Sequence, residues 1–191
     1  MKVMEFIKNG MITTEEVTQR GISRGHLSYL VKKGELERRT RGLYNLPDAW
    51  EDELYAQQVR FSRGIYGLRT ALYLWDLTDR TPQSYEMFFP FGYNLTAVKA
   101  AEILCHQIKR DWYEADICTC TTPGGNTVRV YSRERTLCDI LRPVNHVDKH
   151  TIHEGIRRYL LSSSRDISRL TETANRLRVT PKLRPLLEIL L

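Results

Sequence analysis

The sequence predicts an α+β protein that begins with a winged helix-turn-helix, continues as a mixed α/β region and ends in a helical tail. Within residues 1–47, helix signals, a glycine turn and a hairpin pattern follow one another in the order of a winged helix. Residues 85–90 and 127–131 have the composition or alternation of strands. From residue 132 onward, apolar residues recur at helical spacing. We therefore expect two domains, residues 1–47 and 48–191.

The first helices are short and carry recognisable start signals. Apolar residues within 2–8 predict a first helix. Thr13, followed three residues later by Glu16, has the spacing of a capping box and predicts a second helix that runs to about Arg20. After a glycine turn, Ser23 can cap a third helix by accepting a hydrogen bond from one of its free backbone N–H groups.

The third helix is amphipathic and is followed by a basic hairpin. Leu27, Leu30 and Val31 recur at three- and four-residue spacing and form one apolar stripe. Gly34 is a typical stop signal. Residues 36–46 then predict two short strands joined by a basic turn.

Polar and basic side chains on this helix and hairpin are candidates for contact with DNA. A helix fits the major groove, where Arg24 could pair bidentately with a guanine, and hairpin arginines supply salt-dependent phosphate contacts. Alternation along a flat strand would turn Arg38 and Arg39 to opposite faces. The candidate DNA-binding residues are Ser23, Arg24, His26, Ser28, Tyr29, Lys32, Lys33, Arg38, Arg39 and Arg41.

The remainder of the chain predicts a mixture of helices and strands, after a break at Pro47 where the local charge becomes acidic. The expected helices span residues 48–61, 70–75, 96–110, 133–141, 148–161 and 166–177, with a last one from residue 180. The expected strands span residues 85–90, 114–121 and 127–131, the last two joined as a hairpin by the glycine-containing turn 122–126.

The charge distribution favours a polyanionic partner. The 191 residues carry a net charge of +6 and are 41% hydrophobic, which is enough for a core. Residues 1–47 have 9 Lys/Arg against 5 Asp/Glu, residues 48–128 have 7 against 11, and residues 129–191 have 13 against 7. Because no run of about 18 apolar residues occurs and the start is too polar for a signal peptide, we expect a cytoplasmic protein with reduced thiols and no contact with a membrane.

Side-chain clusters that could support catalysis or metal binding are weak. The four cysteines, at positions 105, 118, 120 and 138, lack CxxC spacing. His150 and His153 are three residues apart, but no third ligand follows at a fixed spacing. Glu114 and Asp116 are expected on one face of a strand, yet no lysine follows as a metal-dependent nuclease would require. We therefore expect no enzyme, metal or cofactor; the alternative is a nuclease targeted by a winged helix.

Arginine is dense in the last third of the chain, where it could form a second surface for an anionic partner. The alternative is a solvated outer face of an amphipathic helical bundle. Arg133 and Arg135 open the helix at 133–141, and either one could instead pair internally with Glu134 or Asp139.

Two stretches carry a family resemblance. The first comprises Lys33–Leu36 and Arg41–Pro47 at the end of the predicted winged helix, and the second is Gly125–Leu141, GNTVRVYSRERTLCDIL. Judged by these two stretches, by the distance between them in the sequence and by the helical tail, nearly the whole chain resembles the AbiEi antitoxins of type IV toxin–antitoxin systems. Those proteins serve in abortive infection against phage.

The resemblance implies a two-domain antitoxin. Its N-terminal domain would repress its own operon by binding inverted repeats in the promoter, and its C-terminal domain would oppose a nucleotidyltransferase-like toxin without a stable complex. Two-fold operators imply two copies on DNA, and the sequence contains no zipper, so we expect a monomer in solution. A winged helix that serves only as a scaffold for protein contact is the competing interpretation. The candidate antitoxin surface comprises Arg133, Arg135, Arg157, Arg158, Arg165, Arg169, Arg176 and Arg178.

Overall fold

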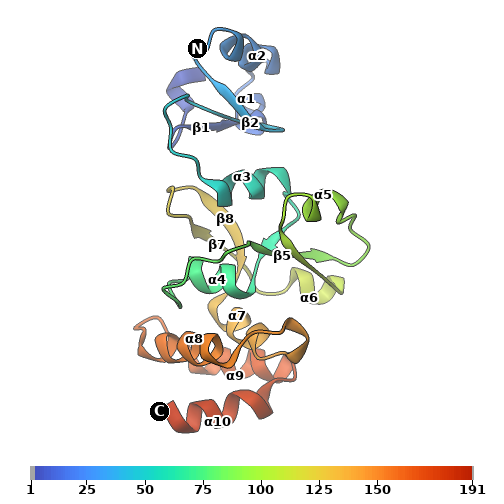
Figure 1. The fold of residues 1–191 in the computed structure, drawn as a ribbon, viewed down its shortest axis with the longest axis vertical. Helices are drawn as coiled ribbons and strands as arrows, with labels where there is room; N and C mark the ends of the chain where they lie inside the picture. Colours follow the sequence, from blue (N-terminus) through green and yellow to red (C-terminus); the bar gives the residue numbers. More distant parts are fainter. Residues whose placement is uncertain (1–2, 191) are drawn as a thin grey trace. The chain divides into compact units, whose positions relative to one another are not determined.

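The structure, a computed structural model, describes residues 3–190 and is a mixed α+β fold (Figure 1). Within that range the chain forms ten α-helices and two β-sheets. Residues 1, 2 and 191 lie outside the described part, so the expected helix at residues 2–8 is described only from Val3. Two compact units can be distinguished: residues up to Arg63 together with Thr121–Val128, and Gly64–Cys120 together with Arg129–Leu191.

The first unit combines three short α-helices with a three-stranded antiparallel sheet of order β1-β3-β2. The expected capping box is confirmed, because Thr13 and Glu16 bond each other's backbone N–H groups at the start of α1. A core of apolar residues that includes Leu27 and Leu30 lies between helices and sheet. The elements are η1 (Val3–Phe6), β1 (Met11–Thr13), α1 (Thr14–Gln19), α2 (Arg24–Lys32), β2 (Glu37–Thr40), β3 (Leu43–Asn45) and α3 (Glu53–Arg60).

The second unit combines a mixed sheet with a C-terminal group of helices, α7 to α10, which Figure 1 shows in orange to red. The sheet has the order β6-β5-β4-β8-β7, and its core continues between the helices. The elements are β4 (Ile65–Tyr66), α4 (Leu68–Leu74), β5 (Glu86–Pro90), α5 (Thr96–Lys99), β6 (Leu104–Ile108), α6 (Arg110–Glu114), β7 (Ile117–Thr121), β8 (Thr127–Tyr131), α7 (Arg133–Ile140), η2 (Pro143–Asn145), α8 (Lys149–Leu161), α9 (Ile167–Arg176) and α10 (Thr180–Leu190).

Most of the expected helices are confirmed, and three assignments are wrong. The expected helix at 96–110 is only the single turn α5, because Glu102 takes a left-handed conformation with φ 57° and the chain continues as strand β6. The expected strand at 114–121 starts at β7 instead, because Glu114 ends α6 and Asp116 has φ 61°. The helix expected from residue 48 is α3, which begins only at Glu53 because Asp52 is its N-cap.

No helix in residues 3–190 combines the length and the apolar composition needed to cross a membrane.

Candidate nucleic-acid interface

Helix α2 presents one polar stripe on the surface of the first unit. Leu27 and Leu30 are buried, which fixes the rotation of the helix. Arg24, Ser28 and Lys32, at intervals of four residues, are all exposed and lie on one face. The stripe is therefore held on a rigid element, with two cations at its ends and a hydroxyl between them.

The N-terminus of α2 is also in place for an anion. The Ser23 hydroxyl accepts a hydrogen bond from the Gly25 N–H at 3.2 Å, as expected for the N-cap. Arg24 donates to the Thr18 hydroxyl at 3.4 Å, a long bond that leaves the guanidinium at the surface. The helix N-terminus carries a partial positive charge that adds to the arginine.

A small aromatic and basic cluster follows on the neighbouring face of α2. The half-buried His26 ring stacks on Tyr29 at 5.9 Å between centroids, and Tyr29 is 49% exposed. The Lys33 ammonium lies 5.0 Å from the Tyr29 ring centroid and 3.6 Å from a carboxylate oxygen of Glu35. Contact with Tyr29, and then with Glu35, raises the pKa of Lys33, so this side chain is a cation at neutral pH.

The β2–β3 hairpin contributes the second group of candidates. Arg38 pairs with Tyr44 and Thr40 with Leu43, so Arg39 is the extra residue of a β-bulge and the strand is not flat there. Arg39 lies 3.6 Å from Glu37 and 3.9 Å from Glu51, so it has two carboxylates close by.

Two other arginines of the hairpin remain fully available. Arg38 and Arg41 are exposed, and neither takes part in an ion pair within residues 3–190. Because a nearby carboxylate competes with phosphate for the guanidinium, these two side chains are better placed for phosphate contact than Arg39.

The arginines of the helical tail do not form one continuous cationic surface. Arg158 pairs with Asp79 and, at 3.3 Å, with Glu154. Two further arginines are also engaged with acidic groups, Arg169 with Glu134 at 3.7 Å and Arg176 with Asp116. The exposed members of the predicted set that pair with no acidic side chain within residues 3–190 are Arg157, Arg165 and Arg178.

Arg135 does not belong to any surface, and its assignment to one is wrong. Its side chain is 0% exposed, and its Nε donates to Asp139 at 2.7 Å, which confirms the internal pairing considered from the sequence. Its Nη1 donates to the Trp112 carbonyl at 3.1 Å, and its guanidinium lies 4.7 Å from the Tyr131 ring. Arg133, by contrast, is half-buried over the Trp75 ring at 4.7 Å.

Burial shifts the pKa values of two groups near Arg135. It raises the pKa of the Asp139 carboxyl, and the adjacent Arg135 opposes that shift. Burial likewise raises the pKa of the Cys138 thiol to about 12, so this sulfur is not a nucleophile at neutral pH.

The acidic residues considered for a nuclease are used in ion pairs. Glu114 accepts from Arg110 at 2.8 Å, while Asp116 holds Arg176 and lies 3.8 Å from Arg135, so the two carboxylates do not share one strand face. Within the described residues, no group of three or more His, Cys, Asp or Glu is arranged to hold a metal ion.

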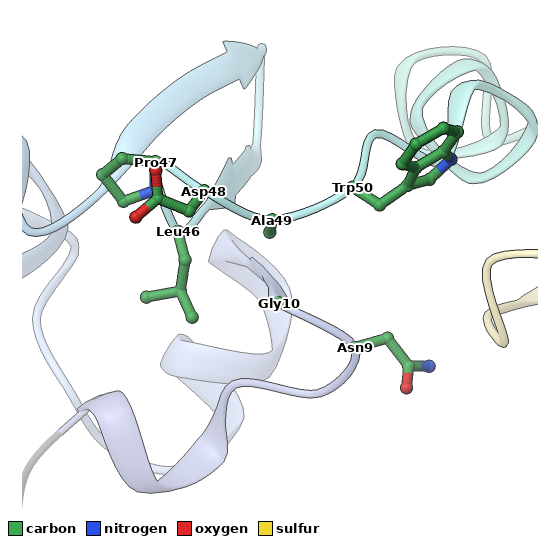
Figure 2. A pocket seen from close by; sticks show the side chains of 7 residues that line it. All are labelled: Asn9, Gly10, Leu46, Pro47, Asp48, Ala49 and Trp50. Atoms are coloured by element: carbon green, nitrogen blue, oxygen red, sulfur yellow. The ribbon is translucent and has the colours of Figure 1, made fainter.

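A pocket of about 460 Å³ lies beside the hairpin in the first unit. Figure 2 shows its seven lining residues, with Trp50 projecting at one end and Leu46 at another. Trp50 is 87% exposed, and the one charged side chain of the lining is the acidic Asp48. Because its charge has the wrong sign for phosphate, this pocket does not extend the basic surface.

Asp52 is a structural residue that the sequence did not single out. Its buried carboxylate accepts hydrogen bonds from the Tyr55 N–H at 3.0 Å, from the Asn126 side chain at 2.9 Å and from the Thr122 hydroxyl. An acidic residue before a helix is a recognisable cap signal, whereas its partners some 70 residues away leave no local signal. Thus the turn at 122–126 is part of the first unit, as are the helices and hairpin.

Comparisons with known proteins found a similar solved structure and a matching family model. The fold resembles the crystal structure of the RV2827C protein from Mycobacterium tuberculosis, with a TM-score of 0.51 and 16% identity over 93% of this chain and 75% of that one. No curated protein matches the chain. The family model described as "Transcriptional regulator, AbiEi antitoxin" matches residues 1–47, the segment that carries α1, α2 and the β2–β3 hairpin.

Proposed function

We propose that the protein is an AbiEi-type antitoxin whose N-terminal unit is a winged helix-turn-helix that binds double-stranded DNA and represses its own operon. The observation that carries this proposal is the stripe of Arg24, Ser28 and Lys32 on α2, together with the exposed hairpin residues Arg38 and Arg41, which form no ion pair within residues 3–190. The family match over residues 1–47, whose description names a transcriptional regulator, supports it.

In this proposal α2 enters the major groove. Its N-terminal residues Arg24 and Ser28 reach base edges, where an arginine pairs bidentately with guanine O6 and N7. Arg38 and Arg41 contact phosphates and fix the position of the unit along the duplex. Arg39, already held by two carboxylates, contributes less.

Inverted repeats require two copies of the chain on one operator, while the free protein is a monomer at dilute concentration. The part of the chain after the family match, residues 48–191, opposes a nucleotidyltransferase-like toxin without a stable complex with it. Its available basic side chains are Arg133, Arg157, Arg165 and Arg178, since the other candidate arginines are buried or paired.

The decisive experiment measures binding to the DNA just upstream of the gene, against a scrambled duplex, across a salt series. We expect a preference of about 10³ or more and a steep salt slope. Arg24→Ala should cost about 1–3 kcal/mol on the specific duplex and relax the preference, because a base contact is lost. Lys32→Ala should weaken both duplexes alike and lower the salt slope by about 1.

Arg38→Ala and Arg39→Ala form a matched pair on the hairpin. The first should weaken binding more than the second, because Arg39 has two carboxylate partners and Arg38 has none within the described residues. Equal and weak binding to both duplexes would contradict the repressor assignment, and unchanged affinity in Arg24→Ala and Lys32→Ala would remove α2 from the interface.

A further inference from the structure

Strand β6 is the free edge of the sheet in the second unit. It is terminal in the strand order and pairs in parallel with β5 over its whole length, from Glu86↔Leu104 to Pro90↔Ile108. Figure 1 shows β5 and the chain around α5 at this end of the sheet. The register is continuous, so no bulge twists this edge away from a partner.

The main-chain groups that face outward can be assigned from two hydrogen bonds. The Leu104 N–H donates to the Tyr85 carbonyl at 2.9 Å, and the Ile108 carbonyl accepts from the Phe91 N–H at 2.8 Å. Because main-chain groups alternate sides along a strand, Cys105 and Gln107 point their N–H and C=O groups away from β5. Among the main-chain hydrogen bonds of residues 3–190, none involves these four groups, which form an unpaired edge two residues long.

The edge lacks the features that usually keep strands apart. The sequence of β6 is LCHQI, which contains no lysine, no proline and no formal charge at neutral pH with neutral histidine. Leu104 is 51% exposed beside it, and Gln107 is exposed as well. The other edge strand, β7, is also uncharged, so a lack of charge alone does not select β6.

The charges at the two ends of β6 have opposite signs, which favours a second copy of the same strand as its partner. Exposed Glu102 precedes the strand and exposed Lys109 follows it. If a second copy pairs antiparallel about a two-fold axis at His106, Cys105 faces Gln107 of the second copy and the Glu102 end faces the Lys109 end. Four main-chain hydrogen bonds then form, and opposite charges meet at both ends. On β7, Asp116 has no cation at the opposite end of the strand, which is followed by Thr122 and Pro123.

We propose that β6 is a self-association surface, through which two copies of this chain pair edge to edge in antiparallel register centred on His106. The contact is small, so it is weak in free solution and becomes populated where two copies are held close together. It stands on the sheet geometry and does not depend on the proposed DNA binding, although two copies on adjacent half-sites would meet that condition.

The first test compares two substitutions at one position in the full chain by sedimentation equilibrium, up to about 1 mM protein, where such weak association is measurable. Gln107→Pro removes an outward N–H without breaking a bond to β5, and should weaken dimerisation by about tenfold or more. Gln107→Ala keeps that N–H while losing the side-chain bond to the Tyr93 carbonyl, and should dimerise like the parent within about threefold. Circular dichroism establishes that both variants are folded.

A charge exchange tests the register and does not depend on the proline variant. Glu102→Lys or Lys109→Glu alone places like charges together at both ends and should weaken dimerisation by about three- to tenfold. The double variant should recover the parent affinity. A monomer at all concentrations, equal dimerisation of Gln107→Pro and the parent, or additive losses in the double variant would each overturn the proposal.

Binding to a single half-site distinguishes this proposal from the DNA-binding one. Gln107→Pro should leave half-site affinity unchanged and reduce only the cooperativity between two half-sites. Arg24→Ala should lose half-site affinity and still dimerise like the parent. That result would support the DNA-binding proposal and would leave the dimer contact unaffected.

Discussion

Arg135 and Arg133 lie two residues apart in α7, yet one is enclosed by protein and the other covers an indole ring at the surface. The buried guanidinium is compensated by Asp139, by the Trp112 carbonyl and by the more distant Asp116. A buried ion pair adds little net stability, but removal of one partner leaves an uncompensated charge in a medium of low polarity.

We therefore expect Arg135→Ala to lower the free energy of unfolding of the second unit by about 3 kcal/mol, because the buried Asp139 would lose its partner at 2.7 Å and keep only Arg142 at 3.6 Å. Arg133→Ala is the matched control and should cost only about 1 kcal/mol, the size of a cation–π contact that is still partly in contact with water. Urea denaturation followed by tryptophan fluorescence measures both. Similar small losses in the two variants would contradict a structural role for Arg135.

Local pairs of residues could be recognised from the sequence, whereas long-range environments could not. Thr13 and Glu16 form the expected capping box because both partners belong to one helical turn. The exposure of Arg24 and Lys32 follows in the same way from the buried Leu27 stripe on their own helix. The burial of Arg135 depends on Trp112, a residue more than 20 positions away, so no local pattern distinguished it from Arg133.

Among the elements, β6 shows how apolar spacing can mislead. Ile103, Leu104 and Ile108 fit one face of a helix, but a short apolar run is equally compatible with a strand. The strand forms because its main chain pairs with β5 and because Glu102, in a left-handed conformation, ends the preceding helical turn. Helices α7, α8 and α9 were predictable because Ser132, Asp148 and Asp166 cap them with local hydrogen bonds.

The cap of α8 makes stability depend on pH. Two bonds from Thr151, a backbone N–H at 2.9 Å and the hydroxyl at 2.8 Å, lower the pKa of Asp148 below its usual 3.8. A carboxyl with a depressed folded pKa stabilises the protein above its unfolded pKa and loses that effect as pH falls through the folded value.

Asp148→Ala should therefore cost about 1 kcal/mol at pH 7, and the cost should shrink as the pH falls below about 4. Asp148→Asn keeps an acceptor without a charge, so it should cost less and lack the pH dependence. Urea denaturation of the three proteins between pH 3 and 8 measures these differences. A cost of Asp148→Ala that is constant over this range would contradict the role of the charged cap.

At the scale of the whole molecule, the N-terminal unit is assembled from segments that are distant in the sequence. The Asn9 amide donates to the Gly125 carbonyl at 2.8 Å, and Asp52 accepts from Asn126 at 2.9 Å. A side chain at Gly124 would place its Cβ 2.6 Å from an Asp52 oxygen, so this close approach requires glycine. A fragment that stops before residue 121 therefore contains the whole basic surface but lacks part of its support.

The proposed function predicts that a fragment of residues 1–80 binds the promoter less tightly than the full chain, because Asp52 loses Thr122 and Asn126. It also predicts that the fragment fails to neutralise the toxin. Survival of toxin-expressing cells measures neutralisation, and a gel-shift titration measures binding. The full chain carrying Arg24→Ala and Lys32→Ala is the matched control, which should neutralise without binding specifically. Cells that survive with the fragment alone would overturn the assignment of neutralisation to residues 48–191.

The turn at 122–126 has a further consequence during synthesis of the chain. Asp52 meets Thr122 across 70 residues and Asn9 meets Gly125 across 116, so these contacts have high contact order. A nascent chain that has released only its first 63 residues from the ribosome cannot yet close them. The N-terminal unit is thus completed only when translation is well past its middle, and a truncated product of an interrupted message would lack a finished N-terminal unit.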